Sequence, residues 1–368
     1  MRGIRKTAPW LFALFIVWGI GRTAPALEFK LLKQFPGAEA PKAVEVSPDG
    51  TYAAVMNLEG FGFWLIDTAT LAIRQKVHFP KTAAKGWNYT RKVTINSFAE
   101  KPVECDFTEN GRYLWVSFHN GESVVRYDVR GENEKTAVSS QKTFIHDIQN
   151  KTKTTAMIPK IQVGVTPKIV KSTPDSKYVL VANWHSNSVS VIDSGTLKQI
   201  KEIIVGGGKR YIPRGIAISS DSRTAYVANM ASGTISVLSL ETLTVIDDVP
   251  VTENPRHLLI SNDDRYLYIS DNIRGLVLKY NIAKKTVEQS VPVGSRARTI
   301  AMTPDGRLLF AAAHYSGKVA AIDTTTFTVL QYIDIERPMG LSVSPNGKQL
   351  WASSYQGGFV NVYEIIGP

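Results

Sequence analysis

The sequence contains very little cysteine and none of the common catalytic signatures. Cys105 is the only cysteine among 368 residues, so no intramolecular disulfide can form and packed cores must hold the fold. The GxSxG, HExxH, Walker and CxxC patterns are all absent. These absences exclude the usual signatures of serine hydrolases, zinc proteases, P-loop enzymes and dithiol oxidoreductases. Cys105 itself is expected to be a small buried residue rather than a reactive thiol.

Helical periodicity is also missing from the chain after residue 26. No window of about 11 to 18 residues repeats its apolar positions at the 3.6-residue spacing of an amphipathic helix. The apolar residues instead form short runs rich in Val, Ile, Tyr and Leu, separated by Gly, Asn, Asp and Pro. The sequence therefore predicts an all-β protein.

A repeated turn divides the chain into seven units. The turn resembles Ser-Pro-Asp-Gly, and its Asp or Asn is found at Asp49, Asn110, Asp175, Asp221, Asp263, Asp305 and Asn346. Successive copies are 61, 65, 46, 42, 42 and 41 residues apart, so the first two units carry insertions. Units of about 40 to 45 residues with four short strands are typical of β-propeller blades.

The last unit is incomplete, because the chain ends after its third strand. A further apolar segment, Leu27–Pro36, precedes the first repeated turn and has no partner within its own unit. We predict that it pairs with the last blade as the fourth strand, which closes the ring and covers a sheet edge. The predicted fold is a single domain over residues 27–368, a seven-bladed β-propeller of four-stranded antiparallel blades.

Three segments carry a family resemblance: YVLVANWHSNSVSVIDSGT, AYVANMASGTISVLSLET and LLFAAAHYSGKVAAIDTTT. Each follows a Ser-Pro-Asp-Gly-like turn, and together they resemble the YVTN-family β-propeller repeat. The architecture is similar to that of the exported bacterial YncE-type propellers. The resemblance implies the propeller fold over the chain after residue 26. Similar propellers include ring-lactone hydrolases, surface-layer proteins, redox-enzyme partners and a proposed binder of single-stranded DNA.

Residues 1–26 have the pattern of a secretory signal peptide. A basic start, MRGIRK, precedes an apolar run of 11 residues, WLFALFIVWGI, and Ala24-Pro25-Ala26 fits a small-x-small cleavage site. Eleven apolar residues are few for a membrane span, and no later segment is longer or more apolar. We therefore expect an exported protein that begins near Leu27, has no transmembrane segment after removal of the signal, and resides in the periplasm or at the cell surface.

The repeat alignment predicts a ring of cations around one end of the propeller channel. The position after the Pro, or its equivalent, that starts each inner strand is occupied by Lys42, Val103, Lys168, Arg214, Arg256, Arg298 and Met339. Equivalent positions in all blades converge on one mouth, where crowded like charges favour an anionic ligand. The alternative is that the cations pair with acids of neighbouring blades. The formal charge of +11, or +7 without the four cations of residues 1–26, also favours anionic partners.

The turns between the second and third strands of the blades form a second column on the same face. Their tips differ from blade to blade, as the loops of a binding surface do. The candidate ligand-binding residues among them are His119, Trp184, His185, His314, Tyr315 and Tyr355. Guanidinium groups bind oxyanions and aromatic rings stack on sugars or bases, so this rim favours phosphorylated or carboxylated ligands. The alternative for Trp184 is that it covers the interface between two blades.

Two insertions interrupt the repeat. The first, Lys81–Lys101, joins blade one to blade two and is predicted to be a lid on the mouth face. The second, about Arg130–Lys153, is predicted to be a mobile loop between the third and fourth strands of blade two, on the opposite face.

Two functions fit these residues. The preferred one is an exported, monomeric, non-catalytic binding or scaffold propeller. At its mouth it would take a protein partner or an anionic ligand, such as a single-stranded nucleic acid, an acidic glycan or a phosphorylated small molecule. The alternative is a lactonase-like hydrolase of a small sugar lactone or ester, in which Glu59, His185 and Arg256 would act. The histidines lack the spacing of metal ligands, so no metal and no cofactor are predicted.

Overall fold

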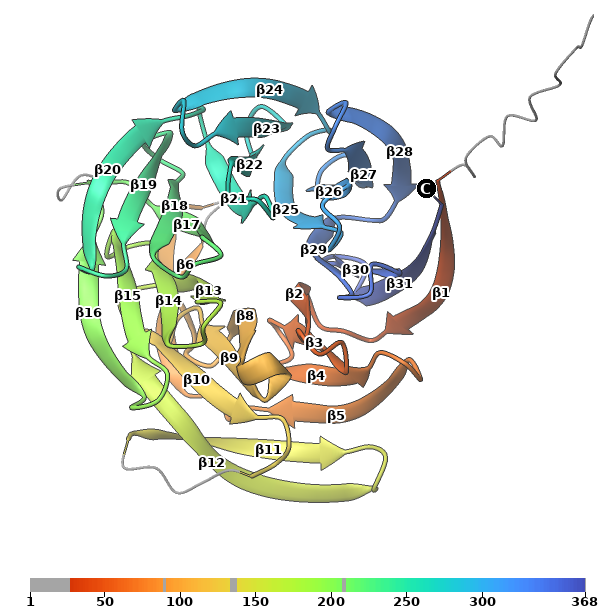
Figure 1. Ribbon diagram of the computed structural model, residues 1–368. Helices are drawn as coiled ribbons and strands as arrows, with labels where there is room; N and C mark the ends of the chain where they lie inside the picture. Colours follow the sequence, from red (N-terminus) through yellow and green to blue (C-terminus); the bar gives the residue numbers. More distant parts are fainter. Residues whose placement is uncertain (1–26, 89–90, 133–137, 207–209, 368) are drawn as a thin grey trace, which may run out of the picture.

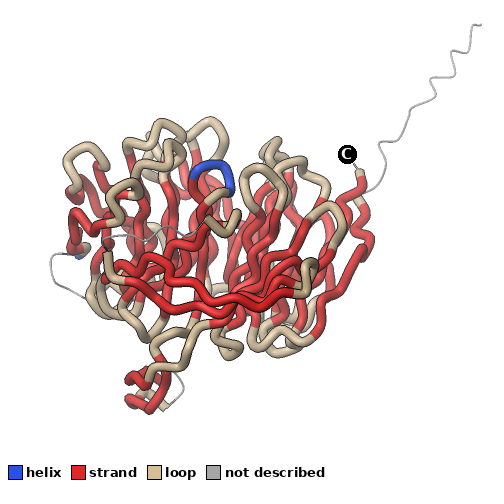
Figure 2. The backbone as a smooth tube through the Cα atoms, turned by 90° about the horizontal axis from the view of Figure 1, so that it is seen from below, coloured by secondary structure: helices blue, strands red, loops and turns tan. Residues whose placement is uncertain are grey.

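The strands form a ring of blades around a central channel, as Figure 1 shows. The computed structural model describes residues 27–88, 91–132, 138–206 and 210–367, so the predicted signal peptide, residues 1–26, lies outside the described residues. Helical structure in these ranges is limited to short 3₁₀ turns such as η1 (Glu109–Gly111). The turns between strands gather at the two faces of the ring (Figure 2). The predicted all-β propeller is confirmed.

Blades three to six are regular four-stranded antiparallel sheets, numbered outward from the channel. Blade three contains β13 (Pro167–Ser172), β14 (Tyr178–Asn183), β15 (Ser188–Asp193) and β16 (Lys198–Ile204). Blade four contains β17 (Pro213–Ile218), β18 (Thr224–Asn229), β19 (Thr234–Ser239) and β20 (Thr244–Pro250). Blade five contains β21 (Pro255–Ile260), β22 (Tyr266–Asp271), β23 (Leu276–Asn281) and β24 (Thr286–Pro292). Blade six contains β25 (Ala297–Met302), β26 (Leu308–Ala313), β27 (Lys318–Asp323) and β28 (Thr328–Asp334).

The two ends of the chain meet in blade seven. This blade contains β29 (Pro338–Val343), β30 (Gln349–Ser354), β31 (Phe359–Ile366) and, as its outer strand, β1 (Glu28–Pro36). β1 runs antiparallel to β31, from Glu28 opposite Ile366 to Pro36 opposite Phe359. Phe35 is buried and stacks on Trp351 with ring centroids 6.1 Å apart. The predicted closure by the N-terminal strand is confirmed.

Blades one and two are joined into one sheet of nine strands. Blade one contains β2 (Pro41–Val46), β3 (Tyr52–Asn57), β4 (Gly62–Asp67) and β5 (Ala72–His78), and blade two contains β8 (Pro102–Thr108), β9 (Tyr113–Phe118), β10 (Ser123–Asp128) and β12 (Thr152–Gln162). An additional strand, β11 (Ser140–Asp147), pairs with β5 on one side and with β12 on the other. It lies at the periphery of the ring in Figure 1.

The prediction of a mobile loop at about Arg130–Lys153 is therefore wrong for the described part of this segment. Gln141, Thr143 and Ile145 are buried and alternate with exposed residues, which is the pattern of a strand with one covered face. The insertion adds a strand that links two blades instead of a free loop.

Apolar side chains fill the space between adjacent blades. The described residues form seven buried apolar clusters, and each cluster combines residues of two neighbouring blades. Middle strands are buried along most of their length, as in β26, whereas outer strands such as β16 bury a single residue. Close packing at every interface makes the ring a rigid frame for side chains that point into the channel.

A bulge near the start of the inner strands shapes the channel mouth. In blade three the pairing register shifts between Pro167 and Val170, and the same shift occurs between Pro213 and Ile216 in blade four. A bulge leaves residues outside the regular ladder and redirects their side chains. The residue after the proline is the first-column residue of the repeat, so these irregularities place the predicted cations at the mouth.

Candidate functional site

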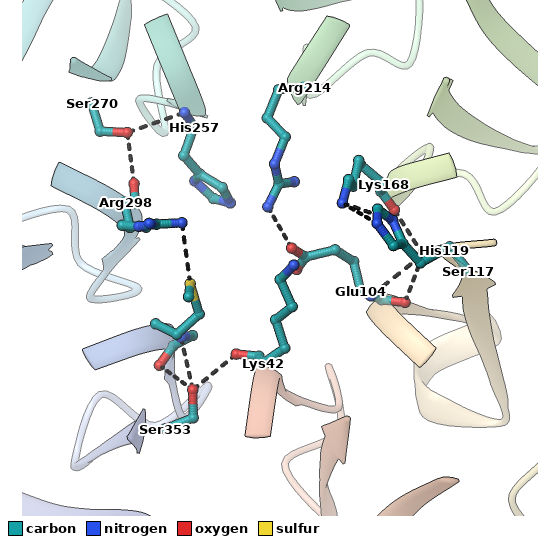
Figure 3. Close-up of polar contacts among 12 residues, drawn as sticks. Lys42, Glu104, Ser117, His119, Lys168, Arg214, His257, Ser270, Arg298 and Ser353 are labelled. Atoms are coloured by element: carbon teal, nitrogen blue, oxygen red, sulfur yellow. Dashed lines mark hydrogen bonds and ion pairs between the residues drawn. The ribbon is translucent and has the colours of Figure 1, made fainter. Parts of the chain in front are cut away.

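The structure brings the five predicted first-column cations together around the channel. They come from the inner strands of blades one, three, four, five and six: Lys42, Lys168, Arg214, Arg256 and Arg298. Lys168, Arg214 and Arg256 are each at most 6% exposed. Figure 3 shows Lys42 and Arg214 directed toward the middle of the channel, where the carboxylate of Glu104 lies. We call these five residues the cation ring.

Glu104, on β8, is an acid within the cation ring. Its Oε1 atom accepts a hydrogen bond from Nη2 of Arg214 at 2.5 Å. Burial alone would raise the pKa of Glu104, but the Arg214 and Lys42 charges hold this pKa below its ordinary value. The repeat comparison did not identify Glu104, because it compared one position in each blade and Glu104 occupies the next one. Extending the comparison by one residue would have found it.

The positive charges of the cation ring exceed the negative charge available to them. Within the described residues, Arg256 and Arg298 make no ion pair, and Nε and Nη1 of Arg214 are buried without a hydrogen-bond partner. Burial and the neighbouring arginines lower the pKa of Lys42 to about 7. The same causes lower the pKa of Arg298 to about 10 and that of Arg256 well below its ordinary value. Burial and mutual repulsion thus disfavour the charged forms of these groups, and a bound anion would favour them.

Lys168 lies between an imidazole and an indole. Its Nζ atom is 2.8 Å from Nδ1 of His119 and 4.1 Å from the ring centroid of Trp184. Burial and the Lys168 charge lower the pKa of His119 well below its ordinary value, so His119 is a neutral hydrogen-bond partner for the amine. Trp184 thus has one face against Lys168, which is a member of the cation ring.

The other predicted tip residues divide into two groups. His185 is exposed and its Nδ1 atom is 2.7 Å from Oγ1 of Thr166, on the side of blade three. His314 is buried, donates a hydrogen bond from Nδ1 to the Pro338 carbonyl oxygen at 3.0 Å, and contacts the rings of Tyr315 and Tyr355. These rings form an aromatic rim over blades six and seven.

Two arginines that were not predicted join this aromatic rim. The guanidinium carbon of Arg337 lies 4.6 Å from the Tyr315 ring centroid, and that of Arg296 lies 5.8 Å from it. Both residues directly precede the first residue of an inner strand, one position before the proline or its equivalent. Both lie in the loop that leads into an inner strand, and a comparison of these loops between blades would have identified them.

Comparisons with known proteins agree with this geometry. Residues 146–300 match the family model of the YNCE-like beta-propeller. The predicted resemblance to YncE-type propellers is confirmed, and the matched segment extends from β11 into β25. No curated protein matches the chain.

The solved structures include a similar fold in hydrazine synthase from Kuenenia stuttgartiensis. The alignment has a TM-score of 0.67 at 19% sequence identity and covers 89% of this chain and 96% of the other. At this identity the likeness shows the propeller fold alone.

A cavity of about 190 Å³ extends along the channel of the propeller beneath the cation ring. Glu104 and His257 line it near the ring, and Glu45 and Lys171 line it further along the inner strands. Burial lowers the pKa of His257 to about 3, and its Nδ1 atom has no hydrogen-bond partner among the described residues. Cys105 also lines the cavity, is buried as expected, and has a thiol pKa raised by that burial.

The first insertion forms a hairpin on the mouth face. It contains β6 (Ala83–Asn88) and β7 (Val93–Phe98). Nδ2 of Asn120, at the tip of blade two, donates hydrogen bonds to Ser97 Oγ at 2.9 Å and to the Phe98 carbonyl oxygen at 3.1 Å. The hairpin is therefore attached beside the predicted second column, as expected for Lys81–Lys101.

The residues of the alternative hydrolase are not brought together. Glu59 binds Nζ of Lys101 at 2.7 Å, whereas His185 binds Thr166 and Arg256 lies in the channel. Within the described residues, no hydrogen bond or ion pair links any two of these three side chains. Nor do the described residues contain a group of three or more His, Cys, Asp or Glu side chains placed to hold a metal ion. No helix in the described part of the chain is long and apolar enough to cross a membrane.

Proposed function

We propose that this YncE-like propeller is a non-catalytic protein that binds an oxyanion-bearing ligand at the mouth of its channel. The observation that carries the proposal is the unused hydrogen-bonding capacity of Arg214, whose Nε and Nη1 atoms are buried without partners in the described residues. A buried donor without an acceptor costs about 1–3 kcal/mol. An oxyanion beside Arg214 would supply the acceptor and recover that free energy.

The arrangement of arginines favours a doubly charged oxyanion. Arg214, Arg256 and Arg298 come from three successive blades, and the planar guanidinium fork suits carboxylate and phosphate oxygens. Arginine stays protonated in proteins, whereas Lys42, with its pKa of about 7, carries a full charge only in acid. Burial also lowers the pKa of Lys168 well below its ordinary value, so the three arginines are the main charges of the ring. Against the carboxylate of Glu104 they leave an excess of two positive charges. A phosphate monoester matches this excess better than a single carboxylate does.

The proposed setting is outside the cytoplasm, with the propeller acting as a monomer. The signal-peptide pattern of residues 1–26 supports export to the periplasm or the cell surface. Closure of the ring by β1 supports a self-contained unit, because the last blade needs no strand from a second copy.

Calorimetric titration of the protein from Leu27 onward tests the proposal. The probes are inorganic phosphate, a hexose phosphate, an acidic glycan and a single-stranded oligonucleotide, each at low and high salt. We expect saturable phosphate binding that weakens at high salt, with a loss of at least about 100-fold in Arg256→Glu. The control is Arg223→Glu, which reverses an exposed charge in the turn between β17 and β18 and should change the affinity by less than about twofold.

Arg256→Gln provides a second variant that removes the charge without inserting an acid into the ring. Circular dichroism and thermal unfolding show whether each variant is folded. Equal phosphate binding by the folded Arg256 variants and the native protein would contradict the proposal. Turnover of a sugar lactone that depends on His185 or Glu59 would replace it with the hydrolase.

A further inference from the structure

A second cavity lies beside the cation ring, between the β6–β7 hairpin and the tips of blades two and three. Its volume is about 220 Å³. The lining includes side chains of the hairpin and of both tips, namely Lys85, Trp87, His119, Asn120, Thr166 and His185. We call this space the hairpin pocket.

The hairpin pocket and the cation ring share a wall. His119 lines the pocket, and its Nδ1 atom is 2.8 Å from Nζ of Lys168 in the ring. Thr166 also lines the pocket and precedes Lys168 by two residues, just before the start of β13. A ligand with its anionic group near Lys168 would therefore have its remaining atoms at the entrance of the pocket.

The hairpin is fixed closely against blade two. A Cβ atom added at Gly86 would lie 2.9 Å from the Cβ of Ser97 and 3.2 Å from Nδ2 of Asn120, so this position requires glycine. The Asn120 amide binds the hairpin through Ser97 and the Phe98 carbonyl, and Lys85 donates a hydrogen bond to Asn96 at 2.7 Å. These contacts make the hairpin a defined wall of the pocket.

The pocket chemistry suits a polyhydroxylated ring without charge. The indole of Trp87 is 40% exposed and presents a broad apolar surface. Burial and the nearby Lys168 charge lower the pKa of His185, and burial lowers that of His119, so both imidazoles are neutral and offer donor and acceptor atoms. Glu122 also lines the pocket, and its carboxylate accepts hydrogen bonds from hydroxyl groups but repels a second anionic group.

We propose that the hairpin pocket is a subsite for the sugar ring of a phosphorylated sugar whose phosphate binds the cation ring. This inference rests on the function proposed above, because the cation ring supplies the anchor for the phosphate. Trp87 packs on the apolar face of the sugar, and the imidazoles, Asn120 and Glu122 bind its hydroxyl groups. The pocket then discriminates among phosphorylated compounds, and the cation ring binds the group that they share.

Titration of inorganic phosphate, glucose 6-phosphate and adenosine monophosphate into native protein and variants tests this assignment. Glucose 6-phosphate should bind at least about tenfold more tightly than inorganic phosphate to the native protein. Trp87→Ala should remove that gain and change the affinity for inorganic phosphate by less than about twofold, because Trp87 lies outside the cation ring. Trp87→Phe should restore most of the gain.

Tyr332→Ala is the matched control, since Tyr332 is an aromatic residue of similar exposure on the outer strand β28. If phosphate fails to bind the native protein, the proposed function itself is wrong. If phosphate binds but glucose 6-phosphate binds no more tightly, the sugar subsite alone is wrong. A gain that is seen only with adenosine monophosphate, or one that survives Trp87→Ala, would also overturn the assignment.

Discussion

The two levels of the channel lining treat buried charge in different ways. At the mouth, the cation ring surrounds the single carboxylate of Glu104. Three residues further along the inner strands, Lys171 lies 3.2 Å from Asp106, and the backbone N–H and hydroxyl of Ser172 each donate a hydrogen bond of 2.7 Å to the same carboxylate. We call Glu45, Asp106 and Lys171 the inner level.

The two levels differ in whether their buried charges are matched by other groups of the protein. Burial raises the pKa of Glu45 to about 8, so Glu45 is mostly protonated at neutral pH, and the Lys171 charge is matched by the carboxylate of Asp106. That level is balanced by the protein alone. The cation ring is not balanced, although buried charges are costly without partners. The unmatched charge at the channel mouth is the basis of the proposed binding site, whereas the matched pair on the same strands serves the fold.

Removing the acid of the inner level should have the largest effect, and only on stability. Asp106→Ala leaves the Lys171 amine without its partner and the Ser172 N–H without its acceptor, so the free energy of unfolding should fall by about 3 kcal/mol. Urea denaturation measures this fall, and phosphate titration of the folded fraction should give the native affinity. The control Asp247→Ala removes an exposed ion pair with Lys285 and should cost less than about 1 kcal/mol. A weakened phosphate affinity in Asp106→Ala would contradict the division between the levels.

Removing the acid of the mouth should instead change binding. Glu104→Gln frees the Arg214 guanidinium from its ion pair and raises the net charge of the ring by one, so phosphate affinity should rise about tenfold. Thermal unfolding should show a lower midpoint than that of the native protein without phosphate and a larger upward shift when phosphate is added. An unchanged or weaker affinity would mean that Glu104 helps to organise the site rather than competing with the anion.

A smaller effect is expected from pH. Lys42 is charged below its pKa of about 7 and neutral above it. Anion affinity should therefore be highest in acid and fall several-fold between about pH 6 and about pH 8.5, as Lys42 loses its proton. Sulfate is the suitable probe because its charge is constant over this range. Lys42→Met should flatten the profile.

Glu45 is the necessary control for that profile. It ionises near pH 8 and then adds a negative charge to the channel, which also weakens anion binding as the pH rises. Glu45→Gln should leave the part of the profile near pH 7 intact. A profile that is flat in native protein, or that persists unchanged in Lys42→Met, would show that Lys42 does not contact the anion.

The repeat pattern predicted the ring of blades and the positions of the five cations, because both follow directly from the period of the sequence. It did not predict Glu104, which lies one residue after the compared column, or Arg296 and Arg337, which lie two residues before it. It also misjudged the insertion that contains β11. The pairing partners of β11 are β5 and β12, which belong to different blades, and a comparison within repeats carries no information about such pairing.

The contact of Trp184 illustrates the same limit. Its position at a turn tip predicts a side chain presented to a ligand, which stays a prediction, but the repeat did not indicate that its ring lies over the Lys168 amine. The position of a residue in a repeat identifies the face on which it lies. Its neighbours on that face depend on rotamers and on adjacent blades, which the period does not specify.

Pairing of β1 with β31 sets an order of events during synthesis. The segment that becomes β1 emerges early, but its partner strand is made last, more than 300 residues later in the sequence. Until then β1 has no neighbour, and Lys30 and Lys33 place charges on a strand that would otherwise attract other chains. The ring can close only after β31 has been made, so a chain that stops before β31 remains open at this blade.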